Sequence, residues 1–102
     1  MSQYDLVGLH EFLAHTPEKG IRKTLIDQNL FSEAHCSLLL KVAKTCTAED
    51  FAEHFENQSF PKVRMTNKES LLKEKFWKDC EKILKERGIL QPAPTGSQKI
   101  AA

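Results

Sequence analysis

Apolar residues recur at helical spacing in five stretches of this chain, and polar or helix-breaking residues separate the stretches. In the first stretch, for example, Leu6, Leu9 and Leu13 fall on one face of a helix. The five stretches leave little room for a strand. The pattern therefore predicts an all-α fold, with helices over residues 3–14, 17–29, 33–46, 48–57 and 67–87.

Hydroxyl residues stand where four of these helices should begin: Thr16, Ser32, Thr47 and Thr66 each precede an acidic residue within three positions. A hydroxyl at the start of a helix accepts a hydrogen bond from a free backbone N–H of the first turn, and the acid interacts favourably with the helix dipole. Ser2 is a fifth candidate of the same kind. These signals divide the chain into four to five helices.

The third stretch is apolar over more than half of its circumference, so it needs neighbours on several sides and is the predicted central helix. The fifth stretch is the longest, about 30 Å at 1.5 Å per residue. Its buried stripe comprises Leu72, Phe76, Cys80, Ile83 and Leu84. Because the helices are short and the links between them shorter still, we expect a compact array with a long C-terminal helix.

The segment before the last helix is predicted to be a loop, since Pro61 blocks a continuous helix. Phe60 and Val63 are expected to anchor this loop, while Lys62 and Arg64 face water.

The last helix is expected to end at Gly88, which suits the position after a helix C-terminus, with Ile89 and Leu90 folding back onto the last turn. The residues that follow are rich in proline, glycine, serine and alanine. The prediction is one helical domain over residues 1–90 and a flexible tail over 91–102.

Charge is distributed unevenly although the formal net charge is only +1. Residues 1–60 hold nine acids and five bases, whereas residues 61–102 hold ten bases and five acids. This asymmetry predicts a polarised surface but is too mild to indicate nucleic acid by itself. No apolar run approaches the length that spans a bilayer, so we expect no membrane contact. Three widely spaced cysteines, each in a helical pattern, are typical of reduced thiols and favour a cytoplasmic, or else nuclear, location.

No motif that carries chemistry is present, so we expect no enzyme, no cofactor and no catalytic residue. The four histidines show no metal-ligand spacing with one another or with the cysteines. Surface histidines and core thiols are the expected arrangement, and a metal site assembled across helices is the rarer alternative. Paired carboxylates such as Glu49 and Asp50 lie on the outer face of an amphipathic helix, where solvation is the ordinary role.

What remains is a small non-enzymatic protein–protein interaction or regulatory module that acts through helix faces. Apolar and aromatic residues outside a core stripe are common anchors at interfaces. The expected partner-binding residues are Lys62, Arg64, Lys68, Leu71 and Trp77. The alternative is a weak nucleic-acid-binding domain that uses the basic 62–87 surface. The partner protein is unidentified, and homo-oligomer formation stays open.

Overall fold

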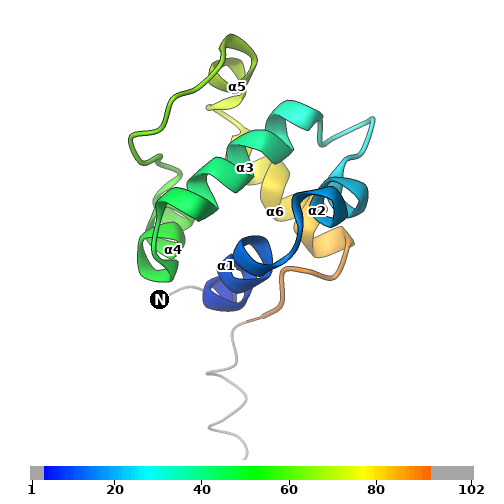
Figure 1. The fold of residues 1–102 in the computed structure, drawn as a ribbon, viewed down its shortest axis with the longest axis vertical. Helices are drawn as coiled ribbons and strands as arrows, with labels where there is room; N and C mark the ends of the chain where they lie inside the picture. The colour runs from blue at the N-terminus through cyan, green and yellow to red at the C-terminus, as the bar shows by residue number, and fades with distance from the viewer. Residues whose placement is uncertain (1–3, 93–102) are drawn as a thin grey trace, which may run out of the picture.

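The computed structural model describes residues 4–92, and within them six α-helices pack into one compact globule (Figure 1). About 65% of the described residues are helical. This range contains no β-strand, only isolated bridges that pair Tyr4 with Pro92 and Asp27 with Phe31. The all-α prediction is therefore confirmed. The helices are α1 (Leu6–His15), α2 (Glu18–Leu25), α3 (Glu33–Thr45), α4 (Ala48–Asn57), α5 (Asn67–Leu72) and α6 (Phe76–Glu86).

Three of the predicted hydroxyl caps are confirmed. Ser32, Thr47 and Thr66 each accept a hydrogen bond from a backbone N–H in the first turn of α3, α4 and α5, respectively. Thr16 is not a cap of this kind, because it closes α1 and Pro17 begins α2 without a side-chain bond. At the first helix, Asp5 accepts from the backbone N–H of Gly8. The Ser2 prediction lies outside the described residues.

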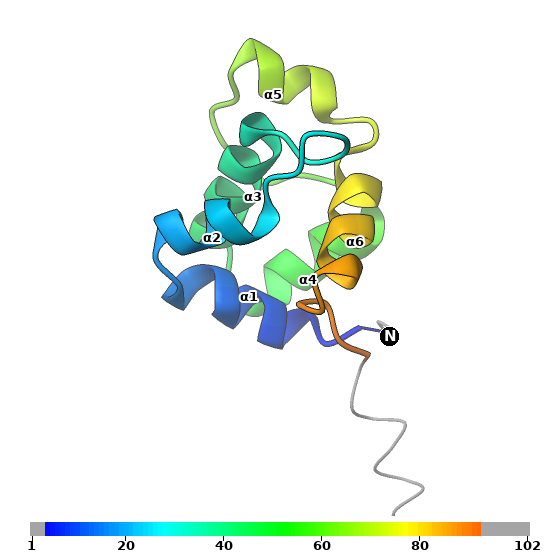
Figure 2. The ribbon, with the colours of Figure 1, turned by 90° about the vertical axis from the view of Figure 1, so that its right-hand side faces the viewer.

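The central position of α3 is also confirmed, since this helix contacts α1, α2, α4 and α5 (Figures 1 and 2). Seven of its thirteen residues are buried. Leucines from α1 and the aromatic side chains of α4 and α6 complete a single apolar core. The one polar strip that α3 keeps faces outward.

The predicted continuous helix over 67–87 is interrupted, and this is the main correction to the expected fold. A turn at residues 73–75 separates α5 from α6, with Lys75 donating its backbone N–H to the Leu72 carbonyl. Figure 2 shows α5 lying across one end of the molecule while α6 runs along its side. No glycine or proline marks the break. It follows from tertiary contacts, because Glu69 is held on α3 while Phe76 enters the core. The longest helix is consequently α3 rather than the C-terminal one.

The end of α6 has the predicted form. Gly88 has φ +73°, and the backbone N–H groups of Gly88 and Ile89 donate to the carbonyls of Lys85 and Leu84. This pair of backbone hydrogen bonds is the Schellman motif, which ends a helix at a residue in the left-handed conformation. Leu90 is buried, as expected.

Residues 91 and 92, the first two of the predicted tail, contact the N-terminal segment. The Gln91 carbonyl accepts from the Asp5 backbone N–H, and Pro92 pairs with Tyr4, so the chain is still attached to the globule there. The remaining part of the predicted tail, residues 93–102, lies outside the described residues.

Candidate functional site

The loop between α4 and α5 is held against the core by its apolar residues. Phe60 stacks on Trp77, with ring centroids 5.5 Å apart, and Val63 and Met65 pack against the core cluster. Lys62 and Arg64, which alternate with these anchors, are exposed. The loop therefore presents two cations on a fixed backbone, as its sequence pattern predicts.

A buried carboxylate joins this loop to α3. Glu69 is only 2% exposed, and its Oε1 accepts from Lys41 Nζ at 2.7 Å and from the Thr66 backbone N–H at 3.0 Å. Lys41 Nζ also donates to the Arg64 carbonyl at 3.0 Å. Burial alone would raise the pKa of the Glu69 carboxyl. The hydrogen bonds from Lys41, Thr66 and Ser37 outweigh burial and hold that pKa below its usual value.

Beside this ion pair lies a shallow hollow of about 370 Å³, which we call the basic groove. Its lining residues are Lys41, Thr45, Lys62, Val63, Arg64 and Thr66. A hollow of about 200 Å³ continues it along α3, lined by Lys41, Lys44 and Arg22 and by the acid Glu18, which pairs with Arg22. A third hollow, of about 380 Å³, adjoins it at Thr66 and includes Lys68 together with the acids Glu33 and Glu69. The three hollows follow the polar strip of α3, between α2 on one side and the loop with α5 on the other.

Only some of the expected partner-binding residues lie at this surface. Lys62 and Arg64 line the basic groove, and Lys68 lines the adjoining hollow. Leu71 is 80% exposed and lies one helical turn beyond Lys68, on the same side of α5. Lys62, Arg64 and Lys68 thus line adjoining hollows, and Leu71 is a helical neighbour of Lys68.

Trp77 does not belong to this region, and its expected place at the margin of the core is wrong. Its side chain is 3% exposed and contacts the rings of Phe51, Phe55 and Phe76 as well as Phe60. Its Nε1–H donates to the Ser59 carbonyl at 2.9 Å, which satisfies the one polar atom of the indole. The burial follows from tertiary contacts, because rings of α4 and of the loop, which are distant from Trp77 in sequence, cover its side chain.

Lys41 and Lys44 were not expected at the site. The structure places Lys41 in the basic groove with Lys62 and Arg64, and Lys44 lines the adjoining hollow with Lys41. The available signal was the narrow polar strip on an otherwise apolar helix. A lysine on such a strip borders whatever segments flank the helix. The sequence did not reveal which segments these are.

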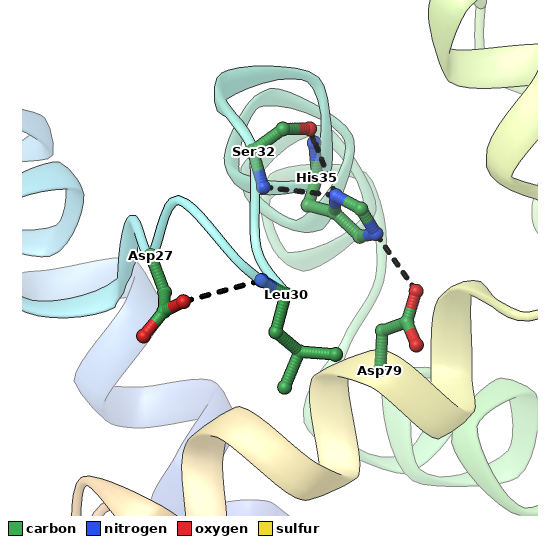
Figure 3. Close-up of polar contacts among 5 residues, drawn as sticks. All are labelled: Asp27, Leu30, Ser32, His35 and Asp79. Atoms are coloured by element: carbon green, nitrogen blue, oxygen red, sulfur yellow. Dashed lines mark hydrogen bonds and ion pairs between the residues drawn. The ribbon is translucent and has the colours of Figure 1, made fainter.

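A second polar cluster lies at the start of α3 (Figure 3). His35 is 6% exposed, and its Nδ1 accepts from the Ser32 backbone N–H at 3.0 Å and lies 2.8 Å from Ser32 Oγ. Its Nε2 lies 3.0 Å from Asp79 Oδ2 on α6. Because Nδ1 accepts a hydrogen bond from the Ser32 backbone N–H, it carries no hydrogen in the neutral ring. The ring hydrogen is therefore on Nε2, which donates a hydrogen bond to Asp79. The cluster thus caps α3 and joins it to α6.

The order of serine, histidine and aspartate in this cluster resembles a catalytic triad, but the bonding is that of a helix cap. The Ser32 backbone N–H already occupies the lone pair of Nδ1 that would take the hydroxyl proton. The serine hydroxyl in turn accepts from the His35 backbone N–H. The expectation of surface histidines is wrong for His35, which is buried by Phe31 and Phe76.

The thiols follow the sequence prediction in part. Cys36 and Cys80 are buried, and Cys46 is half-buried. Burial raises the pKa of the Cys36 thiol and raises that of Cys80 strongly, which keeps both protonated and unreactive. Within residues 4–92, no three histidine, cysteine or acidic side chains are grouped so as to hold a metal ion.

Comparisons with protein families, with curated proteins and with solved structures found no match for this chain. In the described part of the chain, no helix combines the length and the apolar character that crossing a membrane requires.

Proposed function

We propose that this protein is a small, non-enzymatic interaction module that binds an acidic polypeptide segment in the basic groove. The observation that carries the proposal is the placement of Lys62 and Arg64 on an anchored loop, facing the polar strip of α3 across a hollow of about 370 Å³. Three free cysteines accord with a cytoplasmic location, which forms part of the proposal.

The charges around the groove are available to a ligand. Within residues 4–92, the side chains of Lys44, Lys62, Arg64 and Lys68 make no salt bridge. Exposed cations of this kind steer an acidic partner and accelerate its association more than they strengthen the final complex. Affinity needs an apolar contact as well.

Leu71 provides that apolar contact. A leucine that is 80% exposed leaves most of its side chain in water, and burying such a side chain fully contributes about 1.5–3 kcal/mol. Because Leu71 follows Lys68 by one turn, a ligand that lies over Lys68 can cover both. The expected ligand is therefore an acidic segment with an apolar residue near one end.

Nucleic acid is the alternative ligand for the basic 62–87 surface. The outer face of α6 argues against it, because a hollow of about 320 Å³ there is lined by Lys78, Lys82 and Lys85 together with Glu81 and Glu86. Interleaved acids repel phosphates, whereas the loop around Lys62 carries no acid.

Fluorescence anisotropy distinguishes the two ligands. We expect a labelled glutamate-rich peptide with one leucine to bind, and Lys62→Glu/Arg64→Glu to remove the binding. Lys78→Glu/Lys82→Glu is the matched control, because it makes the same change in net charge on exposed residues of α6 and should leave peptide binding intact. Tighter binding of a single-stranded oligonucleotide, with a steep loss in salt, would establish the alternative instead.

A further inference from the structure

The outer face of α4 carries the charge that the basic groove lacks. Its acidic residues Glu49, Asp50, Glu53 and Glu56 are all exposed, while Phe51 and Phe55 on the opposite side are buried in the core. Glu49, Glu53 and Glu56 are spaced four and three residues apart, so they form one row about 10 Å long on the helix. We call this row, with Asp50, the acidic face.

Apart from Lys41, which pairs with Glu69, neither charged surface is neutralised within the molecule. Across residues 4–92, the four salt bridges involve none of the acidic-face carboxylates and none of Lys44, Lys62, Arg64 or Lys68. Two surfaces of opposite charge that do not meet in one copy are free to meet between two copies. Complementary charge of this kind favours encounter and fixes the relative orientation of the partners.

We infer that the acidic segment bound by the basic groove is α4 of a second copy of this chain. The inference rests on the proposed function, because it names the occupant of the same groove. A rigid amphipathic helix is a suitable occupant, since its acidic row is already ordered and needs no further folding on binding. Because Phe51 and Phe55 are buried, α4 offers no large apolar residue to Leu71, so this contact depends on charge and on the preformed helix. The Thr47 hydroxyl accepts a hydrogen bond from the Asp50 backbone N–H, which fixes the start of α4.

The contact joins two different surfaces. A single such contact leaves the bound pair with a free groove at one end and a free acidic face at the other, so further copies can add. Because the contact depends on exposed charge, its strength falls as salt screens that charge.

Charge exchange tests the inference. Sedimentation velocity of the wild type at about 0.01 M ionic strength, where the screening length is about 30 Å, should show species of dimer size or larger that disappear at about 1 M. Lys62→Glu/Arg64→Glu alone and Glu49→Lys/Glu53→Lys alone should each weaken self-association by at least about tenfold. The chain that carries all four substitutions has the wild-type net charge and restores complementarity, so it should associate again.

The matched control exchanges exposed charges elsewhere: Glu74→Lys/Glu86→Lys changes the net charge as the α4 variant does, away from both surfaces. It should associate like the wild type, and circular dichroism should show every variant to be folded. A wild type that stays monomeric at low salt, or a fourfold variant that does not recover, overturns the inference. If the wild type is monomeric but its groove still binds the glutamate-rich peptide, the proposed function stands; if it binds neither, both are wrong.

Discussion

Lys41 on α3 and Glu69 on α5 form an ion pair with 2.7 Å between Nζ and Oε1, across twenty-eight positions of sequence. The Glu69 side chain is buried and the Lys41 side chain is about one-third exposed. This pair holds the six-residue helix α5 against α3 and so forms one wall of the basic groove.

Removing the Glu69 charge should destabilise the fold. Glu69→Gln weakens the hydrogen bonds that the buried Glu69 side chain accepts from Lys41 and the Thr66 backbone, and we expect a loss of about 1–3 kcal/mol in urea denaturation. Glu74→Gln, an exposed acid in the following turn, is the control and should change stability by less than about 0.5 kcal/mol. Equal effects of the two substitutions would mean that the ion pair contributes nothing.

The contribution of Glu69 should depend on pH in a defined direction. Its pKa is lower in the folded protein than in the unfolded chain, so its stabilising effect is present above the unfolded-state pKa and is lost as pH falls through the folded-state pKa. The difference in unfolding free energy between wild type and Glu69→Gln should therefore be largest near neutral pH and should shrink in acid. A difference that grows in acid would contradict the assigned cause.

Trp77 and Leu71 should respond in opposite ways to truncation. Trp77→Ala removes a buried indole that contacts four other aromatic rings and should cost about 3–5 kcal/mol, as much as Phe76→Ala. Leu71→Ala should leave the melting temperature nearly unchanged, because the side chain is exposed, and should weaken peptide binding. A Trp77→Ala variant with wild-type stability would contradict the burial of the Trp77 side chain in the core.

The His35 cluster should be more sensitive at the histidine than at the serine. Ser32→Ala removes one cap and should cost about 1 kcal/mol. His35→Ala also opens a cavity between Phe31 and Phe76 and leaves Asp79 without its donor, so its cost should be at least about 2 kcal/mol. Thermal denaturation of both variants tests the order, and a smaller loss for His35→Ala would show that the cluster is only a cap.

Alanine substitutions at two glycines should change the stability of the fold in opposite directions. Gly88 has φ +73° with open space around the site of a Cβ, so Gly88→Ala incurs only left-handed strain, about 1 kcal/mol. Gly20 lies inside α2, where a Cβ would meet only the Thr16 methyl at 3.5 Å, and Gly20→Ala should stabilise the protein by about 0.5–1 kcal/mol. Denaturant midpoints measure both changes, and changes of the same sign would contradict the backbone argument.

The helix starts at Ser32, Thr47 and Thr66 could be read from the sequence because a cap is a contact between residues three apart. The same holds for the end at Gly88. The core stripe of α1 and the anchors Phe60 and Val63 were likewise predictable, since alternation of apolar and polar residues is a local property of the chain.

Tertiary structure alone decided the break at residues 73–75, the burial of Trp77 and the presence of Lys41 in the groove. No residue in that turn disfavours a helix, and the turn exists because Glu69 is bound to α3 while Phe76 fills the core. Lys41 meets the Arg64 carbonyl across twenty-three positions of sequence. Local patterns determine which residues form helices. Contacts between residues far apart in the chain determine how those helices are oriented, and the basic groove results from these long-range contacts.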